Sequence, residues 1–193
     1  MSSKDNVICR PVCGKSDRTG AKPVCLPIVP AFTHFGPMTS TDSHQGLSSA
    51  GLPDELRLGE PVTDATHAEF LQLLDAMVKA DDAGFLATFD EWIEHTRHHF
   101  AQEEQWMEAM QFGPRFCHTN EHEGVLAVAK AVREKIAEEM CDPEGPGKGG
   151  LSLGRRLAGE LSAWFDNHVK SMDTMMVEHM QANGFTLIEA PAA

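Results

Sequence analysis

Apolar side chains recur every three to four residues along most of the chain after residue 60, which is the spacing of one face of an α-helix. Four such stripes follow one another. The inward positions are His67, Phe70, Leu71, Leu74, Met77 and Val78 in the first stripe; Phe85, Phe89, Trp92, Thr96, His99, Glu103, Met107 and Met110 in the second; His118, His122, Val125, Ala129, Val132, Ile136 and Met140 in the third; and Leu157, Leu161, Trp164, His168, Met172 and Met175 in the fourth.

Turn and capping signals separate these stripes. Pro61 with Thr63 and Asp64 marks the start of the first helix, and Asp81-Asp82 precedes the second. Gly113-Pro114, the segment CDPEGPGKGG at 141–150 and Asn183-Gly184 end the second, third and fourth helices. Four long amphipathic helices with short connections predict an all-α fold, an antiparallel up-down four-helix bundle over residues 61–185.

The flanking segments lack this periodicity. Residues 1–60 are rich in Pro, Gly and Ser, and the three prolines of PVCLPIVPAF at 23–32 exclude a regular helix or central strand there. The sequence therefore predicts an irregular N-terminal extension at 1–60, either docked on the bundle or mobile, with any protein partner unknown. Residues 186–193 are predicted to form a C-terminal tail.

Composition narrows the possible functions. The net charge is -13, and residues 61–193 carry 10 basic and 23 acidic side chains, so nucleic acid and anionic membranes are poor partners. No apolar run is long enough to span a membrane, and the N-terminus has no signal-peptide pattern, so we expect a cytoplasmic protein. Five cysteines, three of them at Cys9, Cys13 and Cys25, do not indicate a disulfide framework.

The histidines carry the candidate chemistry. Five of them lie at inward positions distributed over all four predicted helices, where burial without a common partner is costly, and a metal centre would supply that partner. His99 and Glu103 are four residues apart, so they share one helix face. His168 and Asp173 are five apart, so either a π-type widening of the helix brings both to the metal side or Asp173 reaches around the helix.

These motifs resemble those of bacterial hemerythrins. The matching pieces are the histidine of DATHAEF, H-x3-E in HFAQEE, H-x3-H in HTNEH and H-x4-D in WFDNHVKSMD, in the same order over roughly residues 61–185. The resemblance implies two iron ions, oxo- or hydroxo-bridged, that bind dioxygen. It assigns one iron to His118, His122 and His168, the other to His67 and His99, and the bridges to Glu103 and Asp173.

Further residues are candidates around that site. Phe70, Trp106 and Trp164 either line an apolar oxygen pocket or are ordinary core aromatics. His95, one turn before His99, is a candidate for a supporting contact behind the ligands, whereas His98 points about 100° away and is expected on the surface.

The predicted function is reversible dioxygen binding for storage, delivery or sensing, without catalysis. Five histidines and two carboxylates stabilise high-valent iron less than four carboxylates would, which favours binding over O–O cleavage. Three alternatives stay open: a di-iron enzyme that handles peroxide or nitric oxide, an iron-centre repair protein with N-terminal cysteines, and a structural bundle without metal.

Overall fold

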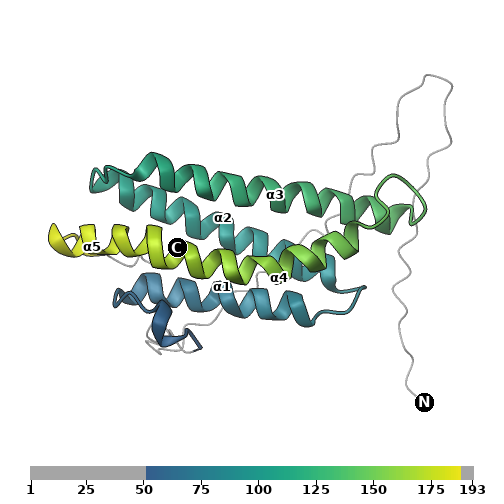
Figure 1. The fold of residues 1–193 in the computed structure, drawn as a ribbon, viewed down its shortest axis with the longest axis horizontal. Coiled ribbons are helices and arrows are strands. Elements are labelled where there is room, and N and C mark those ends of the chain that lie inside the picture. Colours follow the sequence, from purple (N-terminus) through teal and green to yellow (C-terminus); the bar gives the residue numbers. More distant parts are fainter. Residues whose placement is uncertain (1–50, 188–193) are drawn as a thin grey trace, which may run out of the picture. The chain divides into compact units, whose positions relative to one another are not determined.

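The computed structural model describes residues 51–187 of the chain. The described part contains a short 3-10 helix followed by long helices: η1 (Asp54–Leu56), α1 (Pro61–Lys79), α2 (Phe85–Ala109), α3 (Arg115–Cys141), α4 (Gly150–His168), the π-helical turn η2 (Val169–Asp173) and α5 (Thr174–Ala182). Because α4, η2 and α5 follow one another without a break, they form a single fourth rod (Figure 1).

The four rods pack as the apolar pattern predicts. Both α1 and α3 pack against α2 and α4, and successive helices run antiparallel, so the prediction of an all-α up-down bundle is confirmed (Figure 1). Within residues 51–187, no helix is long and apolar enough to cross a membrane.

Two apolar clusters fill the bundle. The larger one contains Phe70, Phe85, Phe89, Trp92 and Phe165, and the smaller one contains Met107, Phe112, Met176, Val177 and Met180. Along α2 the polar residues His99 and Glu103 lie between members of the two clusters. The interior of the bundle is therefore apolar on both sides of a polar layer.

The start of α1 is held by two carboxylates. Glu60 accepts a hydrogen bond from the backbone N–H of Thr63 at 2.8 Å, which caps the helix. Asp64 accepts from the backbone N–H groups of Leu58 and Gly59 at 2.8 and 3.1 Å, which ties the preceding loop to the helix. The first predicted start signal is thus observed, with Glu60 as the capping residue.

Ordered packing begins before α1. Leu52 and Leu56 are buried in the larger apolar cluster, although both belong to the segment predicted as an extension. Residues 1–50 and 188–193 lie outside the described part of the chain, together with Cys9, Cys13 and Cys25. The domain limits at 60 and 185 therefore stay predictions.

Three residues of the predicted stripes are exposed. Val78 and Met140 expose 52% of their surface, because Val78 lies about 100° around α1 from the buried Met77, and Met140 follows the last buried turn of α3. Met175 exposes 44%, and its neighbour Met176 is buried instead. The predicted fourth stripe is one residue early before η2 as well, since Trp164 is only half-buried whereas Phe165 is fully buried. In both pairs the two neighbours are apolar, so the apolar spacing does not decide which one faces the core.

Candidate metal centre

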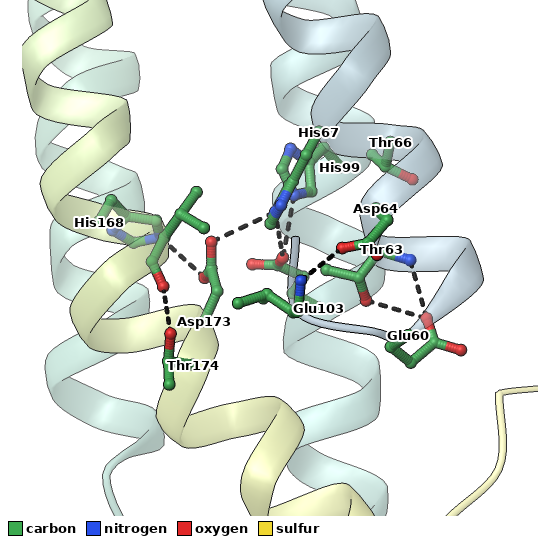
Figure 2. A network of polar contacts seen from close by, with 12 residues as sticks. Glu60, Thr63, Asp64, Thr66, His67, His99, Glu103, His168, Asp173 and Thr174 are labelled. Carbon is green, nitrogen blue, oxygen red and sulfur yellow. Dashed lines mark hydrogen bonds and ion pairs between the residues drawn. The ribbon is translucent and has the colours of Figure 1, made fainter. Parts of the chain in front are cut away.

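Seven polar side chains meet inside the bundle, and none exposes more than 3% of its surface. They are His67 from α1, His99 and Glu103 from α2, His118 and His122 from α3, His168 at the end of α4, and Asp173 at the end of η2. The structure thus brings together all seven residues that the sequence singled out as ligands, and Figure 2 shows five of them, the carboxylates Glu103 and Asp173 with His67, His99 and His168.

Three histidines form one group. Nε2 of His168 lies 3.1 Å from Nε2 of His118 and 3.0 Å from Nε2 of His122. A neutral imidazole has a single N–H, so His168 cannot satisfy both neighbours by hydrogen bonding. Two nitrogens bound at right angles to one metal ion, each at about 2.1 Å, lie about 3.0 Å apart, so these spacings suit a shared ion.

The other two histidines form a second group. The rings of His67 and His99 lie 5.2 Å apart between centroids, and Nε2 of His99 lies 2.9 Å from Oε1 of Glu103. His67, His99 and Glu103 can offer ligand atoms within 4.8 Å of one another, as can Glu103 with the three-histidine group and Asp173. Glu103 therefore belongs to both groups.

Each carboxylate faces both histidine groups. Oε1 of Glu103 lies toward His99, whereas Oε2 lies 3.6 Å from His118 and 3.4 Å from His122. Oδ1 of Asp173 lies 3.1 Å from His118, and Oδ2 lies 3.3 Å from His67. One oxygen of each carboxylate is directed to each group, which is the arrangement that a carboxylate bridging two ions requires.

Several of these potential ligand atoms lack a hydrogen-bond partner within the described residues. They include Oε2 of Glu103, both oxygens of Asp173 and both ring nitrogens of His67. Buried polar atoms are normally satisfied, because an unpaired one costs about 1–3 kcal/mol. These buried nitrogen and oxygen atoms are therefore better suited to binding a pair of cations than to hydrogen bonding among themselves.

The π turn explains how Asp173 reaches this layer. In a regular α-helix, residues five apart lie about 140° from each other, so Asp173 would point away from His168. η2 widens the helix at Val169–Asp173, and Asp173 is fully buried with Oδ1 3.2 Å from Nε2 of His168. The sequence left two explanations for the five-residue spacing, a widened helix or an Asp173 that reaches around a regular one, and the structure shows the widened helix.

Charge inside the cluster sets different protonation states. Burial lowers the pKa of His67, but its contacts with Asp173 and Glu103 outweigh that effect and raise the pKa to about 9. Burial, helped by the charges of His118 and His168 and opposed by that of Glu103, lowers the pKa of His122 to about 3. Although burial raises the pKa of Asp173, contacts with three histidines hold it well below the usual range, so the carboxylate is charged at neutral pH.

Aromatic rings enclose the histidines. Phe100 stacks on His122 with ring centroids 3.7 Å apart, and Phe165 meets His67 edge-on at 5.2 Å. Neither was predicted as a site residue, although the position of Phe100 directly after His99 is a signal that the sequence offered. Both rings fix the orientation of an imidazole by packing alone.

The three predicted pocket residues take different places. Phe70 is buried, stacks on Phe165 at 4.1 Å and meets the ring of His99 edge-on at 6.5 Å. Trp164 stacks on His168 at 4.8 Å and is only half-buried. Trp106 packs with the smaller apolar cluster, and within residues 51–187 no ring contact joins it to the histidines. A common oxygen pocket for these three remains a prediction.

His95 lies beside the two-histidine group. Its ring centroid is 6.1 Å from that of His99, and Nδ1 lies 3.6 Å from the exposed carboxylate of Glu69. Burial, and then the charge of His99, lowers the pKa of His95 to about 4. His98, by contrast, exposes 66% of its side chain, as the sequence predicts.

Comparisons with known proteins give one consistent result. The family model described as Hemerythrin HHE cation binding domain matches residues 60–179. A bacteriohemerythrin of Ralstonia nicotianae is 43% identical over 140 residues, which cover 72% of this chain and 95% of that protein. Bacteriohemerythrins of Stenotrophomonas maltophilia and Pseudomonas paraeruginosa are 26% and 24% identical, over 67% and 70% of this chain and 80% and 84% of those proteins. No solved structure matches.

Proposed function

The chain belongs to the hemerythrin family, as its motifs predict, and on that basis we propose that the buried cluster holds two iron ions and reversibly binds dioxygen. One observation carries this proposal: each carboxylate directs one oxygen to the three-histidine group and the other oxygen to the two-histidine group. Two separate histidine groups with shared carboxylates call for two ions, because one ion cannot use all five imidazoles and both carboxylates at once.

The two histidine groups are unequal. His118, His122 and His168 would hold one iron, and His67 and His99 would hold the other. Because the second group offers one histidine fewer, an external ligand would be expected on that side, and the iron pair would supply the electrons that dioxygen accepts.

The surroundings of the two-histidine group favour a small neutral ligand. Phe70 and Phe165 cover His67 and His99, and both rings are fully buried, which keeps bulk water from that side. His95 and Glu69 lie where this side approaches the surface. We assign to His95 a supporting role: its ring packs beside that of His99 and limits the access of water from this side.

The optical response to oxygen tests the function. The protein is loaded with ferrous iron without air, and a visible absorption band is expected when air is admitted and is expected to vanish on deoxygenation. His99→Gln should abolish the band. His98→Gln, which changes an exposed histidine on the same helix, should leave it intact. A band that never reverses, or sustained consumption of peroxide or nitric oxide lost in His99→Gln, would replace the oxygen-binding role with an enzymatic one.

A further inference from the structure

The position of Asp173 depends on one turn of helix. This carboxylate contacts both histidine groups only because η2 closes after five residues, and a regular turn would carry it about 140° away from His168. A π turn is rare and occurs frequently at functional sites, so the contacts that stabilise it at this point bear on the site.

Thr174 makes a hydrogen bond that belongs to this turn alone. Its hydroxyl donates to the backbone carbonyl of Val169 at 2.8 Å, five residues back (Figure 2). The backbone N–H of Thr174 also donates to that carbonyl. In ordinary helices a threonine hydroxyl bonds the carbonyl three or four residues back. Thr66 does so with Val62 at 2.9 Å, and Thr88 with Phe85 at 3.0 Å.

The hydrogen bond from the Thr174 hydroxyl to the Val169 carbonyl fits the widened turn and would not form in a regular α-helical turn. In an α-helix, the carbonyl of Val169 would accept from the N–H of Asp173, four residues on. Here that carbonyl takes two bonds from Thr174 instead, one from its backbone N–H and one from its hydroxyl. Thr174 thus satisfies the group that the π turn would otherwise leave with a single bond.

We propose that Thr174 is a positioning residue, whose hydroxyl locks the π turn and so holds the Asp173 carboxylate between the two histidine groups. The inference rests on the proposed metal centre. Thr174 does not touch the histidines through any contact of the described residues; it acts through Asp173. Because α5 is also anchored by Met176 and Met180 in the smaller apolar cluster, losing the hydroxyl loosens the turn without unfolding the rod.

Cobalt(II) binding by the full chain tests the proposal, since the visible spectrum of cobalt reports its ligands. Thr174→Val removes the hydroxyl at nearly constant shape, Thr174→Ser keeps it, and Thr88→Val removes a comparable helix bond away from the cluster. We expect about tenfold weaker cobalt binding and an altered spectrum in Thr174→Val only, as for other residues that support metal ligands. Thr174→Ser and Thr88→Val should stay within about twofold of the parent protein.

A second readout needs no metal. Amide hydrogen exchange at residues 169–174 of the metal-free protein should quicken in Thr174→Val and stay unchanged in Thr174→Ser. Cobalt affinity and spectrum in Thr174→Val equal to those of Thr88→Val would overturn the proposal. If Thr174→Val does not fold, Thr174→Ala gives the same comparison. A parent protein that binds neither cobalt nor iron would overturn the metal centre itself, whereas normal binding with an unaffected Thr174→Val removes only the role of Thr174.

Discussion

His67 and His122 are both buried in the same cluster, yet they favour opposite protonation states. His67 contacts Asp173 and Glu103, and these charges raise its pKa to about 9 despite burial. His122 stacks on Phe100 beside other histidines, so burial dominates and its pKa falls to about 3. Without metal, His67 therefore carries a proton at neutral pH, and a metal ion has to displace it.

The pH dependence of the metal-free protein should follow from this difference. Between about pH 3 and 6.5 the unfolded chain binds a proton at His122, and above about pH 4 also one at His95, that the folded protein excludes, so stability rises with pH. Between 6.5 and about 9 the folded protein keeps a proton at His67 that the unfolded chain has lost, so stability falls. Each titration changes the free energy of unfolding by at most about 1.4 kcal/mol per pH unit. Urea unfolding with a chelator should show a maximum near pH 6.5.

Two variants check that assignment. His67→Gln should flatten the fall above pH 6.5, apart from the smaller part due to His168, whose pKa is also raised by Asp173 against the effect of burial. His98→Gln, at the exposed position on α2, should leave the profile unchanged. An unaltered fall in His67→Gln would contradict the assignment.

At the scale of the helices, the sequence predicts the inward positions of the first three helices well. The inward positions of His67, His99, Glu103, His118 and His122 follow from a constant spacing of three to four residues, and all five are buried. The five-residue spacing of His168 and Asp173 even pointed to the π turn. In the fourth helix the count is one residue early on both sides of that turn: Phe165 is buried rather than Trp164, and Met176 rather than Met175. Both members of each pair are apolar, so the pattern alone does not decide which one faces inward.

Contacts between helices are the part that could not be predicted. Phe100 stacks on His122 across α2 and α3, and Phe165 meets His67 across α4 and α1. These pairs depend on the rotation and height of each helix against its neighbour, which periodicity along a single helix does not determine. The hydrogen bonds that Asp64 accepts from the loop before α1 likewise depend on the path of an irregular segment.

The C-terminus of α2 is closed by a residue in a left-handed backbone conformation. Gln111 has a φ of 53°, in the left-handed region, and the N–H of Phe112 returns to the carbonyl of Met107. This closure usually employs glycine, because other residues are strained there. We expect Gln111→Gly to raise the free energy of unfolding by about 0.5–1 kcal/mol, after allowing for the greater freedom of glycine in the unfolded chain.

Denaturant unfolding of the metal-free protein measures this effect. Gln111→Ala keeps the strained backbone and should leave stability within about 0.5 kcal/mol of the parent protein. A loss of stability in Gln111→Gly would mean that the Gln111 side chain contributes more than the backbone strain costs.

For the whole molecule, the buried polar layer should lower the free energy of unfolding, and bound metal should restore it. Five histidines and two carboxylates lie buried between two apolar clusters, and many of their polar atoms lack partners within the described residues. Since such groups destabilise a fold when left unpaired, the metal-free protein should be the less stable form. The surface complicates the measurement, because residues 61–193 carry 23 acidic and 10 basic side chains and attract any divalent cation.

Magnesium separates these two effects. Ferrous iron under anaerobic conditions, at about one hundred times its dissociation constant, should stabilise the fold by about 2.7 kcal/mol for each ion bound. For a chain of this size, that raises the melting temperature by roughly 5–10 °C per ion. Magnesium at the same concentration prefers oxygen ligands and water, so it can screen the acidic surface but should not occupy the histidine groups. We therefore expect a large shift with iron and little with magnesium, and no shift with iron in a variant carrying both Glu103→Gln and Asp173→Asn. Equal shifts with the two metals would place the stabilisation at the surface and leave the buried cluster without a resident ion.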